Sequence, residues 1–483
     1  MADLHDLTAR ELAAAIRDRR TSPSEVLAHT EARADALSER IGAFVTRSPE
    51  LARAQADDAT CLLEESSPEQ LAATRPLLGV PLPIKDLTMV AGVPMRAGSA
   101  ALEGFVPQVD DGVVTRFREA GSVMVGKTNT PEIGLPCYTE PDIAPPARTP
   151  WDLTRSAGGS SGGAAAAVAA GIVPIAHGSD GGGSIRIPAS TCGLVGLKAS
   201  RGRVSNGPHG VDGPALATQG VLTRDVRDTA LALDVLSRPW PGDSALLPGP
   251  QTTFLDACDR REQGLRVGVL TTPLITPGAP VHPEARAAVE KTARALEALG
   301  HHVTEAPVPF EAEEWLPFLD VWSVMAASAP VPEGAEGVLV PLTRWMRERG
   351  RGVSGLAYAN AISAGQRLTR KTAAAWSELD VICMPTLAQP PAPIGSIRDD
   401  ADPEGDFWAQ CAYTPWTSTW NILGWPAMSL PLHQAAAEGS DGGPQVPFGV
   451  ALGAGLGGEE RLLSLAAALE EALPWADRRP PVW

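Results

Sequence analysis

A surplus of basic charge is missing from this sequence. Across 483 residues, 40 Lys and Arg face 57 Asp and Glu, which gives a formal net charge of −17. The phosphates of nucleic acids and the head groups of anionic membranes both bind basic surfaces, so neither is an expected partner. The composition favours an acidic, well-solvated surface.

Paired cysteines and metal-binding patterns are also missing. None of the six cysteines forms a C-x-x-C, and none stands with a histidine at the spacing of a zinc site. Unpaired thiols are typical of a reducing compartment, so we expect a cytoplasmic protein. We expect neither a metal nor any other cofactor.

Long hydrophobic runs are absent as well. The first residues are acidic and contain no apolar core of the kind found in a signal peptide. The longest run of small apolar residues, 164–176, is interrupted by Gly171 and Pro174 and is too short to span a bilayer. We therefore expect no membrane association.

Helix and strand patterns alternate along the rest of the chain. Apolar periodicity and capping boxes predict helices within residues 1–75. A strand, a helix and a second strand over 265–270, 283–299 and 302–306 predict a βαβ unit. Apolar runs predict further buried strands, and a closing helix and a polar loop complete the set: strands 78–90, 122–125, 381–384 and 427–432, helix 459–472 and loop 434–444.

These patterns indicate four parts of the chain. We expect an N-terminal helical segment at 1–75, a core that carries the motifs at 76–310, a helical cap at 311–372 and the C-terminal part of the core at 373–483. The cap is expected from a mainly helical stretch with Gly and Pro interruptions.

A formal match to the phosphate-binding loop begins at Gly121 and ends at Lys127-Thr128. That loop requires the order strand, flexible loop and helix. Here the variable positions 122–125 have strand character, the preceding residues look helical, and Pro131 follows. We therefore predict no nucleotide site.

Two further glycine motifs are weak for similar reasons. The G-x-G-x-x-G at 453–458 is followed by too little chain for a dinucleotide fold, so a strand-to-helix turn is the better interpretation. The G-x-S-x-G at 158–162 lacks the buried strand that precedes a nucleophile elbow. A nucleophile elbow also needs an aspartate and a histidine later in the chain. His301, His302 and His433 are available, but none has a recognisable setting.

Three blocks carry the strongest signal, and they contain Lys85, Ser160 and Ser184. They are separated by 75 and 24 residues and read Pro83-Ile84-Lys85-Asp86, Gly158-Gly159-Ser160-Ser161-Gly162 and Asp180-Gly181-Gly182-Gly183-Ser184. At these residues and this spacing the sequence resembles the amidase signature family. The resemblance covers most of the chain from Lys85 onward and implies an α/β fold, an α/β/α sandwich with a large mixed β-sheet flanked by helices.

The resemblance implies roles for these residues. Ser184 corresponds to the nucleophile, Ser160 to a bridging serine after a cis peptide bond, and Lys85 to the base. The amides of Gly181, Gly182, Gly183 and Ser184 correspond to the oxyanion hole. Ser179 and Gly181 stand where the family often has threonines, which leaves the substrate preference open.

Elementary chemistry supports the same assignment. A serine hydroxyl needs a neighbouring base, and a lysine serves as one only when burial lowers its pKa towards neutrality. The apolar run before Lys85 provides such a setting. Glycines allow bare N–H groups to converge on a developing oxyanion. These residues together predict a serine hydrolase that cleaves C–N bonds of small amides or carbamates.

Other residues are assigned supporting positions. We expect Asp180 and Arg186 to form a buried ion pair that braces the glycine loop, and Ser161 to bond to Lys85 or to the backbone. The expected pocket residues are Cys137, Tyr138, Trp416 and Trp420. Aromatic side chains at such positions are as often part of the core.

Two other functions stay open at this point. One is the glutaminase subunit of a tRNA-dependent amidotransferase, which requires a partner chain. The other is a non-catalytic homologue that serves as a binding module. Among possible substrates are aliphatic amides, anilides, nylon-like oligomers, carbamates or urethanes, and esters, and the protein is expected to be a monomer or a homodimer.

Overall fold

A computed structural model describes residues 3–437 and 443–483. Its strands are β1 (Phe44–Arg47), β2 (Ile84–Lys85), β3 (Gly126–Thr128), β4 (Ile175–Asp180), β5 (Val195–Lys198), β6 (Thr218–Thr223), β7 (Arg266–Val269), β8 (His302–Glu305), β9 (Val381–Pro385), β10 (Ala427–Ala436) and β11 (Gln445–Ala454). Its longer helices are α1 (Ala9–Arg17), α2 (Pro23–Ile41), α3 (Pro49–Glu65), α5 (Gly112–Glu119), α6 (Gly162–Ala169), α8 (Val226–Leu236), α10 (Pro283–Ala298), α11 (Pro317–Ser328), α12 (Pro341–Gly352), α13 (Gly355–Ala375), α14 (Pro403–Tyr413) and α16 (Glu459–Ala472). The short helices α4 (Pro68–Thr74), α7 (Arg186–Cys192), α9 (Phe254–Ala257) and α15 (Thr417–Leu423) complete the set, together with the 3₁₀ turns η1 (Ala100–Leu102), η2 (Glu132–Gly134), η3 (Ala312–Trp315) and η4 (Ala335–Val338).

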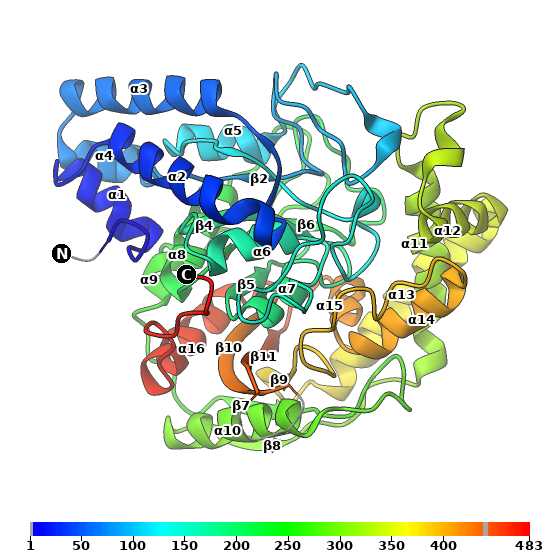
Figure 1. Ribbon diagram of the computed structural model, residues 1–483. Coiled ribbons are helices and arrows are strands. Elements are labelled where there is room, and N and C mark those ends of the chain that lie inside the picture. The colour runs from blue at the N-terminus through cyan, green and yellow to red at the C-terminus, as the bar shows by residue number, and fades with distance from the viewer. Residues whose placement is uncertain (1–2, 438–442) are drawn as a thin grey trace.

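One mixed sheet of eight strands lies at the centre of the molecule (Figure 1). Its order is β4-β6-β5-β10-β11-β9-β7-β8. The strands β8 and β9 run parallel to β7, and the remaining neighbours pair antiparallel. The predicted βαβ unit is confirmed, because α10 connects the parallel strands β7 and β8.

The two faces of this sheet belong to different hydrophobic clusters. Along β9, Val381 and Cys383 pack into one cluster, whereas Ile382 and Met384 pack into another. Alternation with a period of two is what a strand buried on both faces requires. Helices α5, α8, α10 and α16 supply the first cluster, and α2, α6, α7 and the helices from α11 to α15 cover the opposite face. This is the predicted α/β/α arrangement.

The N-terminal part contains more than the expected helices. Strand β1 pairs with β3, and β2 runs parallel to β3 on its other side, in a separate three-stranded sheet. The strands predicted over 78–90 and 122–125 are much shorter than expected, since only β2 and an isolated bridge between Pro81 and Val123 form there. Pro81 and Pro83 have no N–H to donate, which prevents a longer ladder.

The segment expected to be a cap is helical. Helices α11, α12 and α13 pack on one another and lie at the right of Figure 1, next to α14. Glu132 of the core ties this segment down, because one of its carboxylate oxygens accepts the Val340 N–H at 2.8 Å and the other accepts the Ser99 hydroxyl at 2.7 Å. The domain boundaries at 76, 311 and 373 stay predictions.

The weak motifs fold as expected. Helix α5 precedes β3, and Lys127, in the middle of that strand, is buried with its Nζ 2.9 Å from Asp86 Oδ1. The glycines at 453–458 form the turn from β11 into α16. Part of the predicted loop 434–444 is strand, because β10 extends to Ala436, and residues 438–442 of that loop lie outside the described residues.

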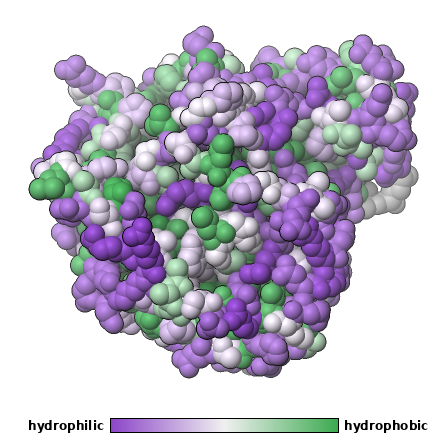
Figure 2. All heavy atoms as spheres, turned by 180° about the vertical axis from the view of Figure 1, so that it is seen from behind, coloured by the Kyte–Doolittle hydropathy of each residue, from purple (hydrophilic) through white to green (hydrophobic). Residues whose placement is uncertain are grey.

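Polar side chains dominate the surface. Hydrophilic residues cover most of the face shown in Figure 2, and hydrophobic side chains gather in a hollowed band across its middle. In the described part of the chain, no helix has both the length and the apolar character required to span a membrane.

Candidate active site

Lys85 is fully buried at the end of β2. Its exposed fraction is 0%, and every residue from Val80 to Ile84 before it is buried. The Nζ atom lies 2.8 Å from Ser160 Oγ, 3.1 Å from Ser179 Oγ and 3.3 Å from the Ser179 carbonyl oxygen. The lysine therefore meets two hydroxyl groups at hydrogen-bond distance and has no carboxylate as a direct partner among the described residues.

Burial controls the protonation of this lysine. It lowers the pKa of Lys85 from 10.5 to about 7, and the charge of Asp180 opposes this shift only in part. A buried ammonium without an ion-pair partner loses its hydration, so the neutral amine is favoured. At neutral pH a substantial fraction of Lys85 is therefore an uncharged amine that can accept a proton.

Ser160 follows a cis peptide bond with Gly159 and is 1% exposed. Its position depends on close backbone packing. A methyl group on Gly159 would meet the backbone of Tyr138 at 2.8 Å, so only glycine fits at this point. The Ser160 carbonyl accepts a hydrogen bond from Thr130 Oγ1 at 2.9 Å, which holds the residue from its other side.

Ser184 ends the glycine loop that connects β4 to α7. It is 9% exposed, and its Oγ makes no hydrogen bond to a described residue. The Ser161 N–H donates to the Ser184 carbonyl at 3.2 Å, so the residue next to Ser160 touches Ser184 directly. Ser161 Oγ also donates to the Ser179 carbonyl at 3.3 Å, which is the backbone contact expected of it. Lys85 thus contacts Ser160, the residue after Ser160 contacts the Ser184 backbone, and Ser184 is the least buried of the three predicted residues.

The carboxylate of Asp180 organises the glycine loop. It accepts the N–H groups of Gly183 at 2.8 Å, Ile185 at 3.2 Å and Arg186 at 3.4 Å. This bond corrects the prediction for Gly183, whose N–H is directed to the carboxylate and is not free for an oxyanion. The N–H groups of Gly181, Gly182 and Ser184 donate to no described residue, so they are the amides available to a ligand.

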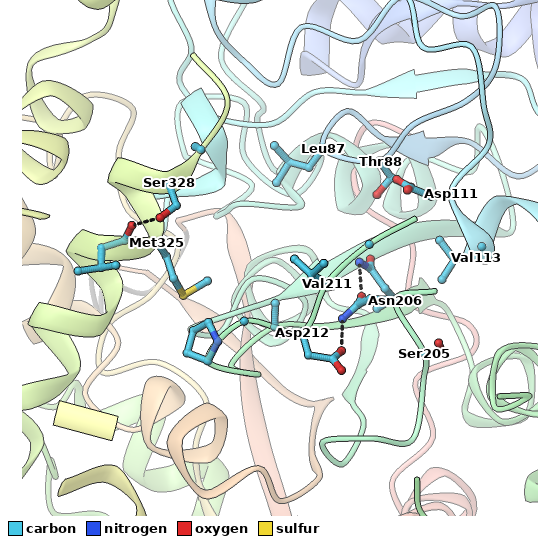
Figure 3. A pocket seen from close by; sticks show the side chains of 18 of the residues that line it. Leu87, Thr88, Asp111, Val113, Ser205, Asn206, Val211, Asp212, Met325 and Ser328 are labelled. Atoms are coloured by element: carbon cyan, nitrogen blue, oxygen red, sulfur yellow. Dashed lines mark hydrogen bonds between the residues drawn. The ribbon is translucent and has the colours of Figure 1, made fainter. Parts of the chain in front are cut away.

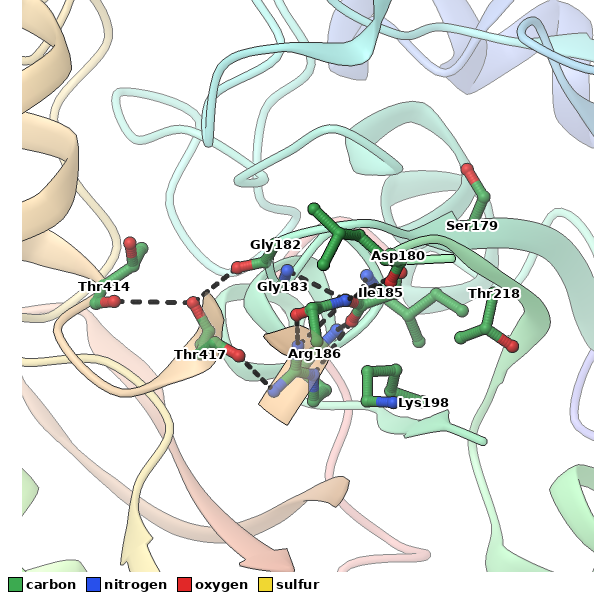
Figure 4. Close-up of polar contacts among 12 residues, drawn as sticks. Ser179, Asp180, Gly182, Gly183, Ile185, Arg186, Lys198, Thr218, Thr414 and Thr417 are labelled. Atoms are coloured by element: carbon green, nitrogen blue, oxygen red, sulfur yellow. Dashed lines mark hydrogen bonds and ion pairs between the residues drawn. The ribbon is translucent and has the colours of Figure 1, made fainter. Parts of the chain in front are cut away.

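Arg186 fixes Asp180 in place, as expected (Figure 4). Its Nη1 donates to the Thr417 carbonyl at 2.9 Å and its Nη2 to Asn421 Oδ1 at 2.7 Å. Asn421 Nδ2 returns a bond to Asp180 Oδ1 at 3.0 Å. Burial by itself would raise the pKa of Asp180, but Arg186 and Asn421 hold this pKa well below its usual range. Thr417 Oγ1 also donates to the Gly182 carbonyl at 2.7 Å, which anchors the loop to α15.

The two predicted pocket tryptophans belong to the core. Trp416 and Trp420 are each 1% exposed within the hydrophobic cluster on one face of the sheet. Trp420 lies so close to Gly453 of β11 that no side chain fits at that glycine. The prediction is wrong for these residues, because both rings are enclosed in this cluster and leave no surface for a substrate.

Cys137 and Tyr138 lie beside the cis peptide bond, where the Tyr138 backbone packs against Gly159. They pack with Ile187 and Tyr413 in a small apolar cluster. The Tyr138 hydroxyl donates to Asp406 Oδ2 at 2.6 Å. Neither side chain lines the cavity described next, so their role there stays a prediction without support from the geometry.

Figure 3 shows a cavity of about 460 Å³. It lies beside the glycine loop, because Ala217 of its lining would stand 3.8 Å from a methyl group on Gly181. The loop 205–214, the segment after Lys85 and helix α11 form its walls. Helix α11 also places Trp322 against the oxyanion loop, because a methyl group on Gly181 would meet the Trp322 ring at 3.3 Å. Sequence reasoning missed Trp322, since helical periodicity marks the helix but not the neighbour it faces.

Metal ligands are scarce. In the described part of the chain, one group of three residues could share an ion, and it consists of Asp3, His5 and Asp6 before α1. None of these residues contacts Lys85, Ser160 or Ser184.

Comparisons with known proteins agree with this geometry. The family described as Amidase matches residues 25–463. The 6-aminohexanoate-cyclic-dimer hydrolase of Paenarthrobacter ureafaciens is 36% identical over 500 residues, covering 98% of this chain and 96% of the relative. A solved structure of 6-aminohexanoate cyclic dimer hydrolase superposes with a TM-score of 0.89 at 33% identity over 100% of both chains. A bacterial aryl acylamidase of the amidase signature family superposes with a TM-score of 0.86 at 25% identity over 98% of both chains.

Fold and relatives together define an enzyme that hydrolyses carboxylic amides at C–N bonds other than peptide bonds. The chain belongs to the amidase signature family.

Proposed function

We propose that this amidase forms an acyl-enzyme on Ser184, with Ser160 and Lys85 as the proton relay. The observation that carries the proposal is the 2.8 Å separation between Lys85 Nζ and Ser160 Oγ in a site where burial lowers the pKa of the lysine to about 7. A neutral amine at that distance is a competent general base for a hydroxyl group.

In the first step, Ser184 Oγ attacks the amide carbonyl carbon while its proton passes to Ser160 Oγ and the Ser160 proton passes to Lys85. The Ser184 hydroxyl makes no hydrogen bond to a described residue, and Ser184 is the least buried of the three residues, which suits a nucleophile. Hydrogen bonds in an empty catalytic site often shorten only when substrate binds, so contact between the two serines is expected in the complex.

The oxyanion that forms is stabilised by the N–H groups of Gly181, Gly182 and Ser184. The three amides are free, and the contacts of Asp180 and Thr417 hold the loop that carries them. Fixed donors of this kind lower the barrier without reorganisation during the reaction.

Collapse of the tetrahedral intermediate breaks the C–N bond. Ser160 donates its proton to the departing nitrogen and regains one from Lys85, because an amine anion is a very poor leaving group. Water then attacks the acyl-enzyme through the same relay in reverse and releases the carboxylic acid.

The substrates we propose are small non-peptide amides such as anilides and aminoalkanoate oligomers. Two similar proteins, a 6-aminohexanoate-cyclic-dimer hydrolase and an aryl acylamidase, support these classes. Carbamates and esters react through the same steps and are proposed as additional substrates. All six cysteines are free thiols, which supports a cytoplasmic location.

Hydrolysis of acetyl 4-nitroanilide by the purified chain tests the assignment of Ser184 as nucleophile and Lys85 as base. The 4-nitroaniline released is followed by its absorbance. Lys85→Met and Ser184→Ala should each reduce kcat at least about a thousandfold. Lys198→Met is the matched control, because burial also lowers the pKa of Lys198 to about 7, but its Nζ bonds to the Ala199 carbonyl and to neither serine.

The control variant Lys198→Met should retain hydrolysis. A second control is His433→Ala, since His433 pairs with Glu284 at 2.7 Å on another part of the sheet. Loss of activity in His433→Ala with retention in Lys85→Met would move the chemistry to a histidine-based triad. Hydrolysis by the purified chain alone also excludes the amidotransferase subunit as its main role.

A further inference from the structure

The cavity next to the active site has apolar walls and two carboxylates in its lining. On one wall lie Leu87, Val113 and Thr88, and helix α11 contributes Val324 and Met325 to the wall opposite. These side chains offer an apolar surface of the size that accommodates an alkyl chain. The cavity volume of about 460 Å³ suits a small molecule.

Two contacts join this cavity to the reacting serines. On helix α11, Trp322 and Met325 are three residues apart and share one face, with Trp322 against the oxyanion loop and Met325 at the cavity wall. On the opposite side, Leu87 of the cavity wall and Ser160 are both neighbours of Gly134. A methyl group on Gly134 would lie 2.4 Å from the Leu87 side chain and 3.3 Å from Ser160 Oγ. These contacts place the cavity beside the reacting serines.

A chain of hydrogen bonds also connects the cavity wall to Lys85. The Lys85 N–H donates to His177 Nδ1 at 3.3 Å, so the neutral imidazole presents its Nε2 hydrogen to Gln219 Oε1 at 3.0 Å. Gln219 Nε2 then donates to Asn206 Oδ1 at 3.3 Å, and Asn206 Nδ2 to Asp212 Oδ1 at 3.2 Å. Every donor points the same way, and the chain ends on a carboxylate at the cavity.

The charges along the cavity wall are all negative. Asp111 and Asp212 line the cavity, whereas no Lys, Arg or His is found among the described residues of its lining. Two basic side chains, Lys127 and His209, lie near Asp111 outside that lining. Lys127 is paired with Asp86 at 2.9 Å, and His209 is exposed on the loop.

We propose that this cavity selects substrates by charge, accepting an alkyl chain that is neutral or ends in an ammonium group and disfavouring one that ends in a carboxylate. The inference rests on the proposed function, since it names the substrate class for the same site. Carboxylates within a few ångströms of a bound anion repel it strongly in a partly dry cavity. The apolar wall binds the methylene chain in each case.

Matched substrates test this selection. The first series places the charge on the acyl chain: hexanoyl, 6-aminohexanoyl and 5-carboxypentanoyl 4-nitroanilide. The second places it on the amine side: N-acetylhexylamine, N-acetyl-1,6-diaminohexane and N-acetyl-6-aminohexanoate. In at least one series, kcat/KM for the carboxylate should be lower than for the ammonium compound by about tenfold or more at low salt.

A pair of neighbouring variants separates the cavity from the overall charge of the protein. Asp110 and Asp111 each accept a backbone N–H, from Ala91 and Met89, both at 2.7 Å, but only Asp111 lines the cavity. Asp111→Asn should reduce the ratio of ammonium to carboxylate kcat/KM about fivefold. Asp110→Asn removes the same unit of charge and should leave this ratio unchanged.

Each outcome decides between the alternatives. Equal kcat/KM for the carboxylate and ammonium compounds in both series overturns the selection, as does an Asp111→Asn ratio equal to that of the wild type. If Asp111→Asn does not fold, Asp212→Asn gives the same comparison. If the protein hydrolyses none of the compounds, the neutral ones included, this result refutes the proposed function and not the charge selection.

Discussion

The guanidinium of Arg186 binds both oxygens of the Asp180 carboxylate, from Nε to Oδ2 and from Nη2 to Oδ1, each at 2.9 Å. Both side chains are buried beneath the glycine loop. Arg186→Met leaves a buried carboxylate without its cation, and the free energy of unfolding should fall by about 3–5 kcal/mol. Urea denaturation followed by circular dichroism measures this change.

A surface pair provides the comparison for this prediction. Arg349 and Asp320 lie 2.6 Å apart but are partly exposed, so Arg349→Met should cost about 1 kcal/mol or less. Equal losses for the two variants would contradict the bracing role assigned to Asp180 and Arg186.

The pH dependence of the reaction follows from Lys85. Only the neutral amine accepts a proton, and burial sets the pKa of this lysine at about 7. As the pH falls below that value, the protonated fraction grows, so kcat/KM should drop about tenfold per unit and should level off at higher pH. Initial rates with a neutral anilide between pH 5 and 9 measure the profile. A rate that does not change below pH 7 is inconsistent with a lysine base.

Gly159 offers a test of how Ser160 is held. Gly159→Ala forces a methyl group against the Tyr138 backbone at 2.8 Å, so the serine must shift, and kcat should fall about a hundredfold. Gly278→Ala, at a glycine with open space around it, is the control for a general effect of glycine replacement. If the two variants have the same kcat, the close packing at Gly159 does not position the serine.

Two tryptophans distinguish the site from the core. Trp420→Ala removes a fully buried ring and should reduce the free energy of unfolding by about 3–5 kcal/mol. Trp322→Ala removes a half-buried ring beside Gly181, and should lower kcat/KM about tenfold with a smaller loss of stability. Steady-state kinetics and urea denaturation of both variants give the comparison, and the reverse pattern would return Trp420 to the substrate pocket.

The candidate catalytic cluster could be predicted from the sequence because its signal is local. Ser160 and Ser184 stand in short glycine and serine blocks, and Lys85 follows an apolar run that buries it. The α/β/α layers follow from the same kind of pattern, since strand β9 is a continuous buried run and residues 427–432 of β10 are buried as well.

The errors come from contacts between distant segments. Trp420 fits an apolar helix equally well in either orientation, and only the approach of β11 at Gly453 decides that it faces the sheet. Trp322 belongs to a helix that the periodicity identifies, yet nothing in its pattern indicates that it lies on Gly181. The Asp180 bond to Gly183 depends on the bend of the loop, which no residue type specifies.

The most direct test of the account is to identify the serine that reacts with a fluorophosphonate probe, by peptide mapping and mass spectrometry. With Ser184 as nucleophile and Lys85 as base, we expect a single adduct on Ser184 in the wild-type protein. We expect very little labelling in Lys85→Met, which retains that serine but lacks the base. An adduct on Ser160 or Ser161, or undiminished labelling in Lys85→Met, would contradict the assignment of nucleophile and base.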